Sequence, residues 1–154
     1  MGWLNDTNSG SYSPFTPGVS VGLRNVGSYQ VSGPPFITGS ANMGTANSIA
    51  VVSFPYVAKE VTVFTSGSNS QLQVGFRNEG ATGGNVFGTG RHYISLSNAD
   101  STTPTSHTFD VKCTAVYVKN INANAAFEVY ASLTNIPTQR MYQLTGSGIT
   151  DDPT

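Results

Sequence analysis

Apolar and polar residues alternate with a period of two, and this pattern constrains the fold more than any other feature of the sequence. In the run 127–133 every second side chain is apolar, and the residues between them are Glu128, Tyr130 and Ser132. The run 71–77 alternates in the same way. Successive side chains of a strand point to opposite faces, whereas a helix would repeat every 3.6 residues. The positions predicted to form the core are Leu72, Val74, Phe76, Phe127, Val129 and Leu133.

Similar runs predict six further strands. The predicted strands are residues 19–24, 49–54, 57–65, 71–77, 91–97, 109–113, 116–119 and 127–133. The strand at 49–54 is expected to stop at Pro55, because proline has no N–H for the hydrogen-bond ladder. Glycine and proline punctuate residues 27–47, which are predicted to be mostly loop, and residues 98–106 are predicted to be a polar loop.

The composition agrees with an all-β chain of one domain. Its 154 residues are one domain's worth, and its 17 glycines and 8 prolines disfavour long helices. Eight short antiparallel strands predict an antiparallel eight-stranded β-sandwich, a single jelly roll. An immunoglobulin-like sandwich is the alternative, although the Cys…Trp…Cys spacing of that fold is missing. We divide the chain into an extended N-terminal arm (1–17), the jelly-roll domain (18–150) and a C-terminal tail (151–154).

Charge and cysteine content exclude several functional classes. Seven Lys and Arg residues against eight Asp and Glu give no basic excess, which argues against direct binding to nucleic acid. No apolar run approaches the ~20 residues of a transmembrane helix, and the first ten residues do not resemble a signal peptide. One cysteine permits no intrachain disulfide, and so we expect assembly in a reducing compartment.

No set of residues predicts catalysis or cofactor binding. The glycine-rich stretch 80–90 is not followed by a helix or a Lys-Ser/Thr pair, so it is predicted to be a loop rather than a phosphate site. A zinc site would require Cys113, His92 and His107 to converge from separate strands. We predict instead that Cys113 is a small buried apolar residue and that no metal binds. The carboxylates are scattered and no nucleophile elbow is present, so we predict that the protein is not an enzyme.

The two ends of the chain carry the candidate assembly contacts. The arm 1–17 is too polar and too interrupted by proline to fold alone, and its ordering entropy has to be offset by a neighbouring molecule. Beyond the strand broken by Pro137 lie residue types that are enriched at interfaces. The predicted contact residues are Trp3, Leu4, Tyr12, Phe15, Arg140, Met141 and Tyr142.

Several segments between residues 49 and 150 resemble a known family. They are FPYVAKEVTV (54–63), FDVKC (109–113) followed by Tyr117 and Val118, and FEVYASLTNIP (127–137), which leads to RMY (140–142) and LTGSGI (144–149). Together they resemble the small single jelly-roll capsid proteins of large icosahedral double-stranded DNA viruses, including the penton proteins of five-fold vertices.

This resemblance implies a structural subunit of a capsid that has no active site. It implies a homopentamer that contacts neighbouring major and minor capsid proteins in a virion assembled inside the host cell. A carbohydrate-binding module or attachment lectin with a β-sandwich fold is the alternative, because a jelly roll alone does not separate the two functions. A decoration or fibre-head protein of a different type of virus is a third hypothesis.

Overall fold

The computed structural model describes residues 22–23, 26–27, 33–67, 70–76, 93–98, 104–141, 144–145 and 150–151. Every strand pairing in it is antiparallel, which confirms the predicted all-β class. No helix in these ranges is long and apolar enough to cross a membrane. The elements are β1 (Pro35–Ser40), β2 (Ile49–Ser66), β3 (Gln71–Gly75), β4 (Ile94–Ser97), β5 (Ser106–Phe109), β6 (Cys113–Asn120), β7 (Ala126–Pro137), the 3₁₀ turn η2 (Thr138–Arg140), β8 (Leu144–Thr145) and β9 (Thr150–Asp151).

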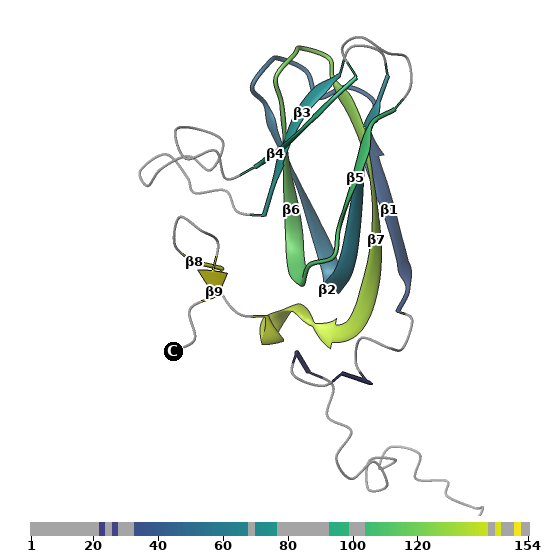
Figure 1. The fold of residues 1–154 in the computed structure, drawn as a ribbon, viewed down its shortest axis with the longest axis vertical. Coiled ribbons are helices and arrows are strands. Elements are labelled where there is room, and N and C mark those ends of the chain that lie inside the picture. Colours follow the sequence, from purple (N-terminus) through teal and green to yellow (C-terminus); the bar gives the residue numbers. More distant parts are fainter. Residues whose placement is uncertain are drawn as a thin grey trace, which may run out of the picture.

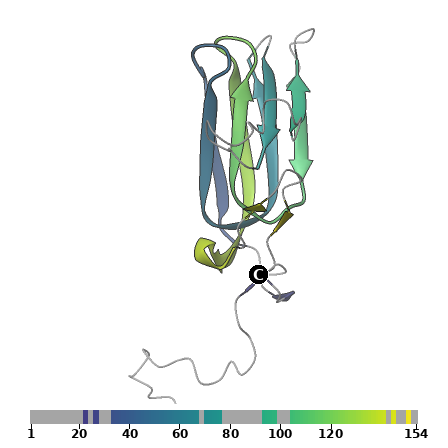
Figure 2. The same cartoon turned by 90° about the vertical axis from the view of Figure 1, so that its left-hand side faces the viewer.

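Strands β1 to β7 form one hydrogen-bonded sheet in the order β1-β7-β2-β6-β3-β4, with β5 also paired to β2. The strands align along the long axis of the domain, and the yellow-green η2 turn lies at its lower end (Figures 1 and 2). The pairings are nested along the chain. From the innermost pair outward they are β3 with β4, the second half of β2 with β5, the first half of β2 with β6, and β1 with β7.

Strand β2 reverses direction near its middle. Its 18 residues would span about 60 Å if they were straight. However, Ile49 pairs with Lys119 and Ser66 pairs with Ala126, and the chain between those two partners reaches at most about 25 Å. Both ends of β2 therefore lie at the same end of the domain, and the sheet folds over on itself (Figure 1).

The prediction that the strand stops at Pro55 was wrong, because β2 continues through it. The predicted runs 49–54 and 57–65 are its two halves. What is interrupted is the pairing with β6, whose register shifts between Ser53 and Ala58. Proline has no N–H to donate there, so the reversal falls where the ladder is weakest.

A buried threonine satisfies the backbone at this reversal. The Thr134 hydroxyl donates to the Val57 carbonyl at 2.7 Å and accepts from the Ile136 N–H at 3.1 Å. Thr134 is fully buried. It therefore replaces ladder hydrogen bonds that the irregular register of β2 and β7 leaves unmade.

Three other strand predictions need correction. Residues 35–40 are not loop but the edge strand β1, despite Pro35 and Gly39. The predicted strand 109–113 is interrupted, because residues 110–112 connect β5, which ends at Phe109, to β6, which begins at Cys113. Strand β5 begins at Ser106 inside the predicted loop 98–106. In the predicted strand 19–24, Gly22 and Leu23 are not in a strand, and the rest lies outside the described residues.

The core follows the predicted alternation. Leu72, Val74, Phe127, Val129 and Leu133 are all buried, and Phe76 is half-buried against them. Edge-on ring contacts join β1 to the first half of β2 and the end of β3 to β5. The ring centroids are 5.3 Å apart for Phe36 and Phe54 and 5.1 Å apart for Phe76 and Phe109. A smaller cluster of Leu23, Val57 and Ile136 closes the end at which β2 reverses.

Replacing Thr134 tests the role of this hydroxyl at the reversal of β2. Thr134→Val keeps the shape but leaves a buried carbonyl and a buried N–H unpaired, so the free energy of unfolding should fall by about 1–3 kcal/mol. The control is Thr45→Val, because Thr45 is exposed and water can replace the bond between its hydroxyl and the Ser48 hydroxyl. This control should change stability by no more than about 0.5 kcal/mol in urea titrations. Equal losses in the two variants would contradict the assignment.

Candidate functional site

The described residues contain no group of three or more His, Cys, Asp or Glu side chains that could hold a metal ion. Of the three residues weighed as zinc ligands, His92 lies outside the described ranges. His107 is exposed on β5 and contacts the Phe109 ring edge-on, with centroids 4.6 Å apart. Cys113 is 1% exposed, which confirms the prediction that it is a small buried residue.

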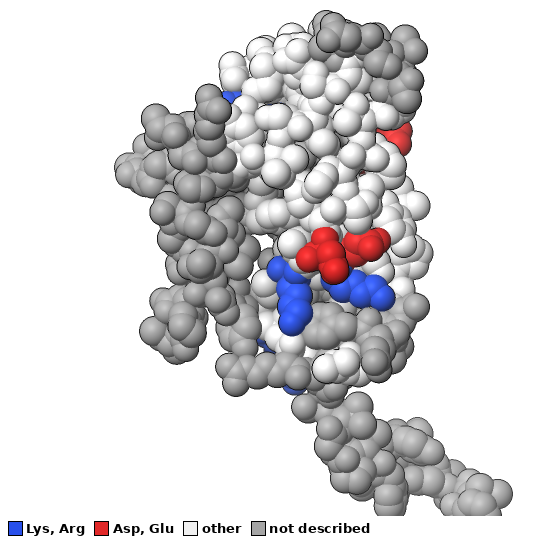
Figure 3. All heavy atoms as spheres, in the orientation of Figure 1, with Lys and Arg blue, Asp and Glu red and all other residues white. Residues whose placement is uncertain are grey.

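Charged side chains gather where β2 reverses. A pocket of about 350 Å³ is lined by Lys59, Asp110, Val111 and Lys112. The Lys112 ammonium donates to the Leu23 carbonyl at 3.1 Å and so ties the N-terminal segment to the domain. Figure 3 shows acidic and basic side chains together in the lower part of the visible face and an almost uncharged surface above them. The pocket therefore has mixed charge, and Lys112 has a structural role in it.

Two of the seven candidate assembly residues lie in the described part of the chain. Met141 is half-buried against the cluster of Leu23, Val57 and Ile136, so it packs on its own domain. Arg140 is exposed in η2. Trp3, Leu4, Tyr12, Phe15 and Tyr142 lie outside the described residues.

Apolar side chains are exposed on the outer surface of β1, β7, the second half of β2 and β5. We call this surface face A and define it by Ile37, Glu60, Thr62, Phe64, Glu128 and Tyr130. Ile37 pairs with Tyr130, and Tyr130 pairs with Thr62 on its other side. The Ile37 side chain is 76% exposed and the Tyr130 side chain is 37% exposed. The alternation in 127–133 predicted that Tyr130 would lie on the face opposite the core. Residues 35–40 were predicted to be loop, so an exposed Ile37 beside Tyr130 was not expected.

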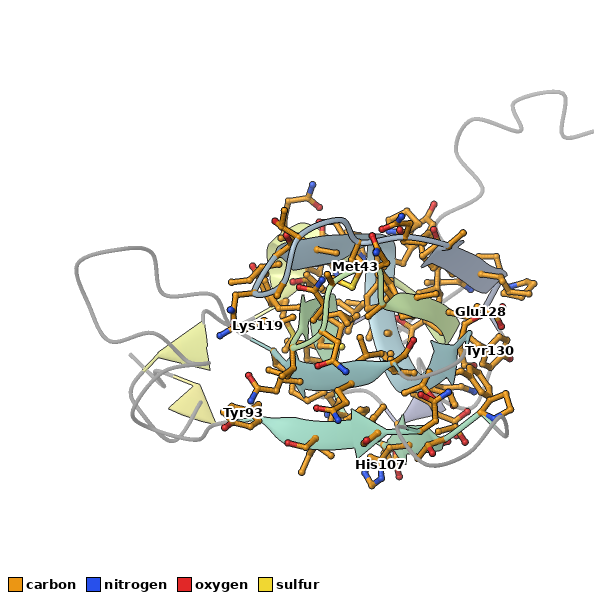
Figure 4. The ribbon with its side chains drawn as sticks, turned by 90° about the horizontal axis from the view of Figure 1, so that it is seen from above. Met43, Tyr93, His107, Lys119, Glu128 and Tyr130 are labelled. Carbon is orange, nitrogen blue, oxygen red and sulfur yellow. The ribbon has the colours of Figure 1, made fainter. Side chains whose placement is uncertain are left out.

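A second exposed apolar surface lies on the outer side of the first half of β2, β6 and β3. We call it face B and define it by Ile49, Val51, Gln73, Tyr117 and Lys119. Ile49 pairs with Lys119 and Val51 with Tyr117, and the two aliphatic side chains are 37% and 52% exposed. Viewed from above, Lys119 lies on the opposite side of the domain from Glu128 and Tyr130 (Figure 4). Faces A and B therefore lie on different sides of the domain.

Comparison with known proteins gives no family. No family model matches the sequence, and no curated protein matches it. Among solved structures, a chain from Bacillus endospore appendages, described as a novel family of disulfide-linked pili, aligns with a TM-score of 0.32 and 13% identity. The alignment covers 67% of this chain and 94% of that one. A likeness of this strength supports no argument about the function of the present chain.

The buried thiol predicts a stability effect at alkaline pH. Burial raises the pKa of Cys113 from 9.0 to about 12. The unfolded thiol loses its proton first, so the free energy of unfolding should fall as the pH rises from about 9 toward 12. Between pH 8 and pH 10 the thiol should contribute a loss of about 1 kcal/mol.

The matched variant is Cys113→Ala, which should lack this component while keeping the pH dependence of the other groups. Urea titrations of both proteins across this range isolate the thiol. Parallel stability curves for the two proteins would contradict the burial assigned to Cys113.

Proposed function

We propose that this chain is a structural protein of a virus particle, a penton or other minor capsid protein that forms a pentameric vertex. Its partners are further copies of itself and neighbouring capsid proteins, and its place is the virion assembled in the host cell. The observation that carries the proposal is the pair of outer surfaces, faces A and B, with large apolar groups exposed on a domain of low charge. Such surfaces favour contact with other proteins over contact with solvent.

The strand pairings support a single jelly roll as the fold of this capsid subunit. A jelly roll is a long antiparallel ribbon wrapped into two four-stranded sheets. The nested pairs described above make such a ribbon when the two halves of β2 are counted as separate strands. Wrapping then brings β7 beside the second half of β2 and β6 beside β3, and both of these pairings occur. One half of the fold is then β1-β7-β2-β5 and the other is β2-β6-β3-β4.

A carbohydrate-binding module or attachment lectin is the second candidate. Tyr130 is exposed on face A, and Glu128 lies two residues from it along the same strand face. The Glu128 carboxylate accepts a hydrogen bond from the Ser66 hydroxyl at 3.4 Å. An exposed aromatic ring beside polar groups is also how sheet surfaces bind sugars, because the ring can stack on the apolar side of a sugar while the polar groups bind its hydroxyls.

The oligomeric state separates the two functions. Light scattering coupled to size-exclusion chromatography should give a discrete species of five times the 16.2 kDa protomer mass. A glycan array probed with the same sample should show no binding. A monomer that binds glycans would contradict the capsid proposal and favour the lectin.

Removal of residues 1–17 tests the predicted role of the N-terminal arm in assembly. We expect the truncated chain to keep the β-rich circular dichroism spectrum and unfolding midpoint of the full chain, because the described core begins after the arm. Its assembly should weaken, because the apolar anchors of the arm would be lost. A folded truncated protein that assembles as well as the full chain would contradict the role given to Trp3, Leu4, Tyr12 and Phe15.

A further inference from the structure

Faces A and B differ in the sign of their charge. The charged residues of face A are carboxylates, Glu60 and Glu128, on outward positions of β2 and β7. The charged residue of face B is Lys119, on an outward position of β6. These assignments cover the described residues of the two surfaces. The faces are thus complementary in charge, and both carry exposed apolar groups.

We propose that copies of this chain associate by packing face A of one copy onto face B of the next. This inference rests on the proposed structural function and assigns the surfaces through which it would operate. The contact would bring Ile37 and Tyr130 of one copy against Ile49 and Val51 of the next, with Glu128 close to Lys119. Apolar burial supplies the attraction, and the opposite charges select this arrangement over A on A or B on B.

The arrangement follows from the distribution of charge over the fold. Packing A on A would oppose carboxylates, and packing B on B would oppose ammonium groups, and both cost free energy. An A-to-B contact uses a different surface on each partner, so it is heterologous. Heterologous contacts build rings when the rotation between copies closes and filaments when it does not. A symmetric dimer is therefore not the expected product.

The position of Glu128 within face A favours a role in recognition. A Cβ atom added to Gly39 would lie 2.6 Å from the Phe127 carbonyl oxygen and 3.3 Å from the Cγ atom of Glu128. The strands β1 and β7 therefore approach closely here, and the acidic side chain passes beside the one position of β1 that lacks a side chain. Gly39 thus leaves room for Glu128 between β1 and β2, next to the apolar row of Ile37 and Tyr130. An ion pair at the border of an apolar contact contributes more to specificity than to affinity.

A charge swap tests this contact. Glu128→Lys and Lys119→Glu should each weaken self-association by about tenfold, measured as the dissociation constant by sedimentation velocity. The double variant restores opposite charges between copies and should recover most of the wild-type association. Glu128 and Lys119 lie on opposite sides of one domain (Figure 4), so the recovery would have to arise between copies. Each variant is checked for an unchanged circular dichroism spectrum and unfolding midpoint.

Apolar variants give a second, independent measurement. Ile37→Ser and Val51→Ser should each reduce association, whereas Val26→Ser should leave it unchanged, because Val26 is 69% exposed but belongs to neither face. Association that survives both single charge reversals, or a double variant weaker than each single one, would overturn the A-to-B contact and leave the structural function standing. A wild-type chain that stays monomeric at every concentration would overturn both.

Discussion

Strand β2 turns back near Pro55, and its two halves pair with different neighbours. Because one strand pairs with β6 through its first half and with β7 and β5 through its second half, it links both parts of the sheet. The reversal leaves the backbone around Val57 without a regular partner, and the buried Thr134 hydroxyl supplies one. The same folding over turns alternate side chains of each strand inward, which encloses the core and leaves faces A and B outside.

The period-two alternation was sufficient to predict the all-β class and the core positions on β3 and β7, because it records directly which side of a strand is buried. It was insufficient for β1, since Pro34, Pro35 and Gly39 give this segment the composition of a loop. That strand forms because β7 offers it an unpaired edge, which is a tertiary effect. Pro55 was misread for a related reason: it interrupts pairing without ending the strand, and the sequence does not show that the chain turns back there.

The candidate surfaces were less accessible to sequence reasoning than the core. The chain ends were chosen by composition, and Met141 proves to pack on its own domain. Ile37 lay in a predicted loop. Val51 lay in a predicted strand, but its apolar run does not say which face of the strand will be inward once neighbouring strands are in place. The opposite charges of the two faces depend on strand order, which puts Glu60 on the same face as Glu128 and places Lys119 on the other side. Burial of Cys113, in contrast, followed directly from its place in an apolar run.

Single-particle electron cryomicroscopy of the purified full-length chain would show the symmetry of the assembly and its contacting surfaces in one measurement. We expect closed five-fold rings in which face A of each domain contacts face B of the next and neighbouring domains are rotated by one fifth of a turn. Images that contain only monomers would contradict the structural function. Rings in which both faces remain in solvent would contradict the assigned contact.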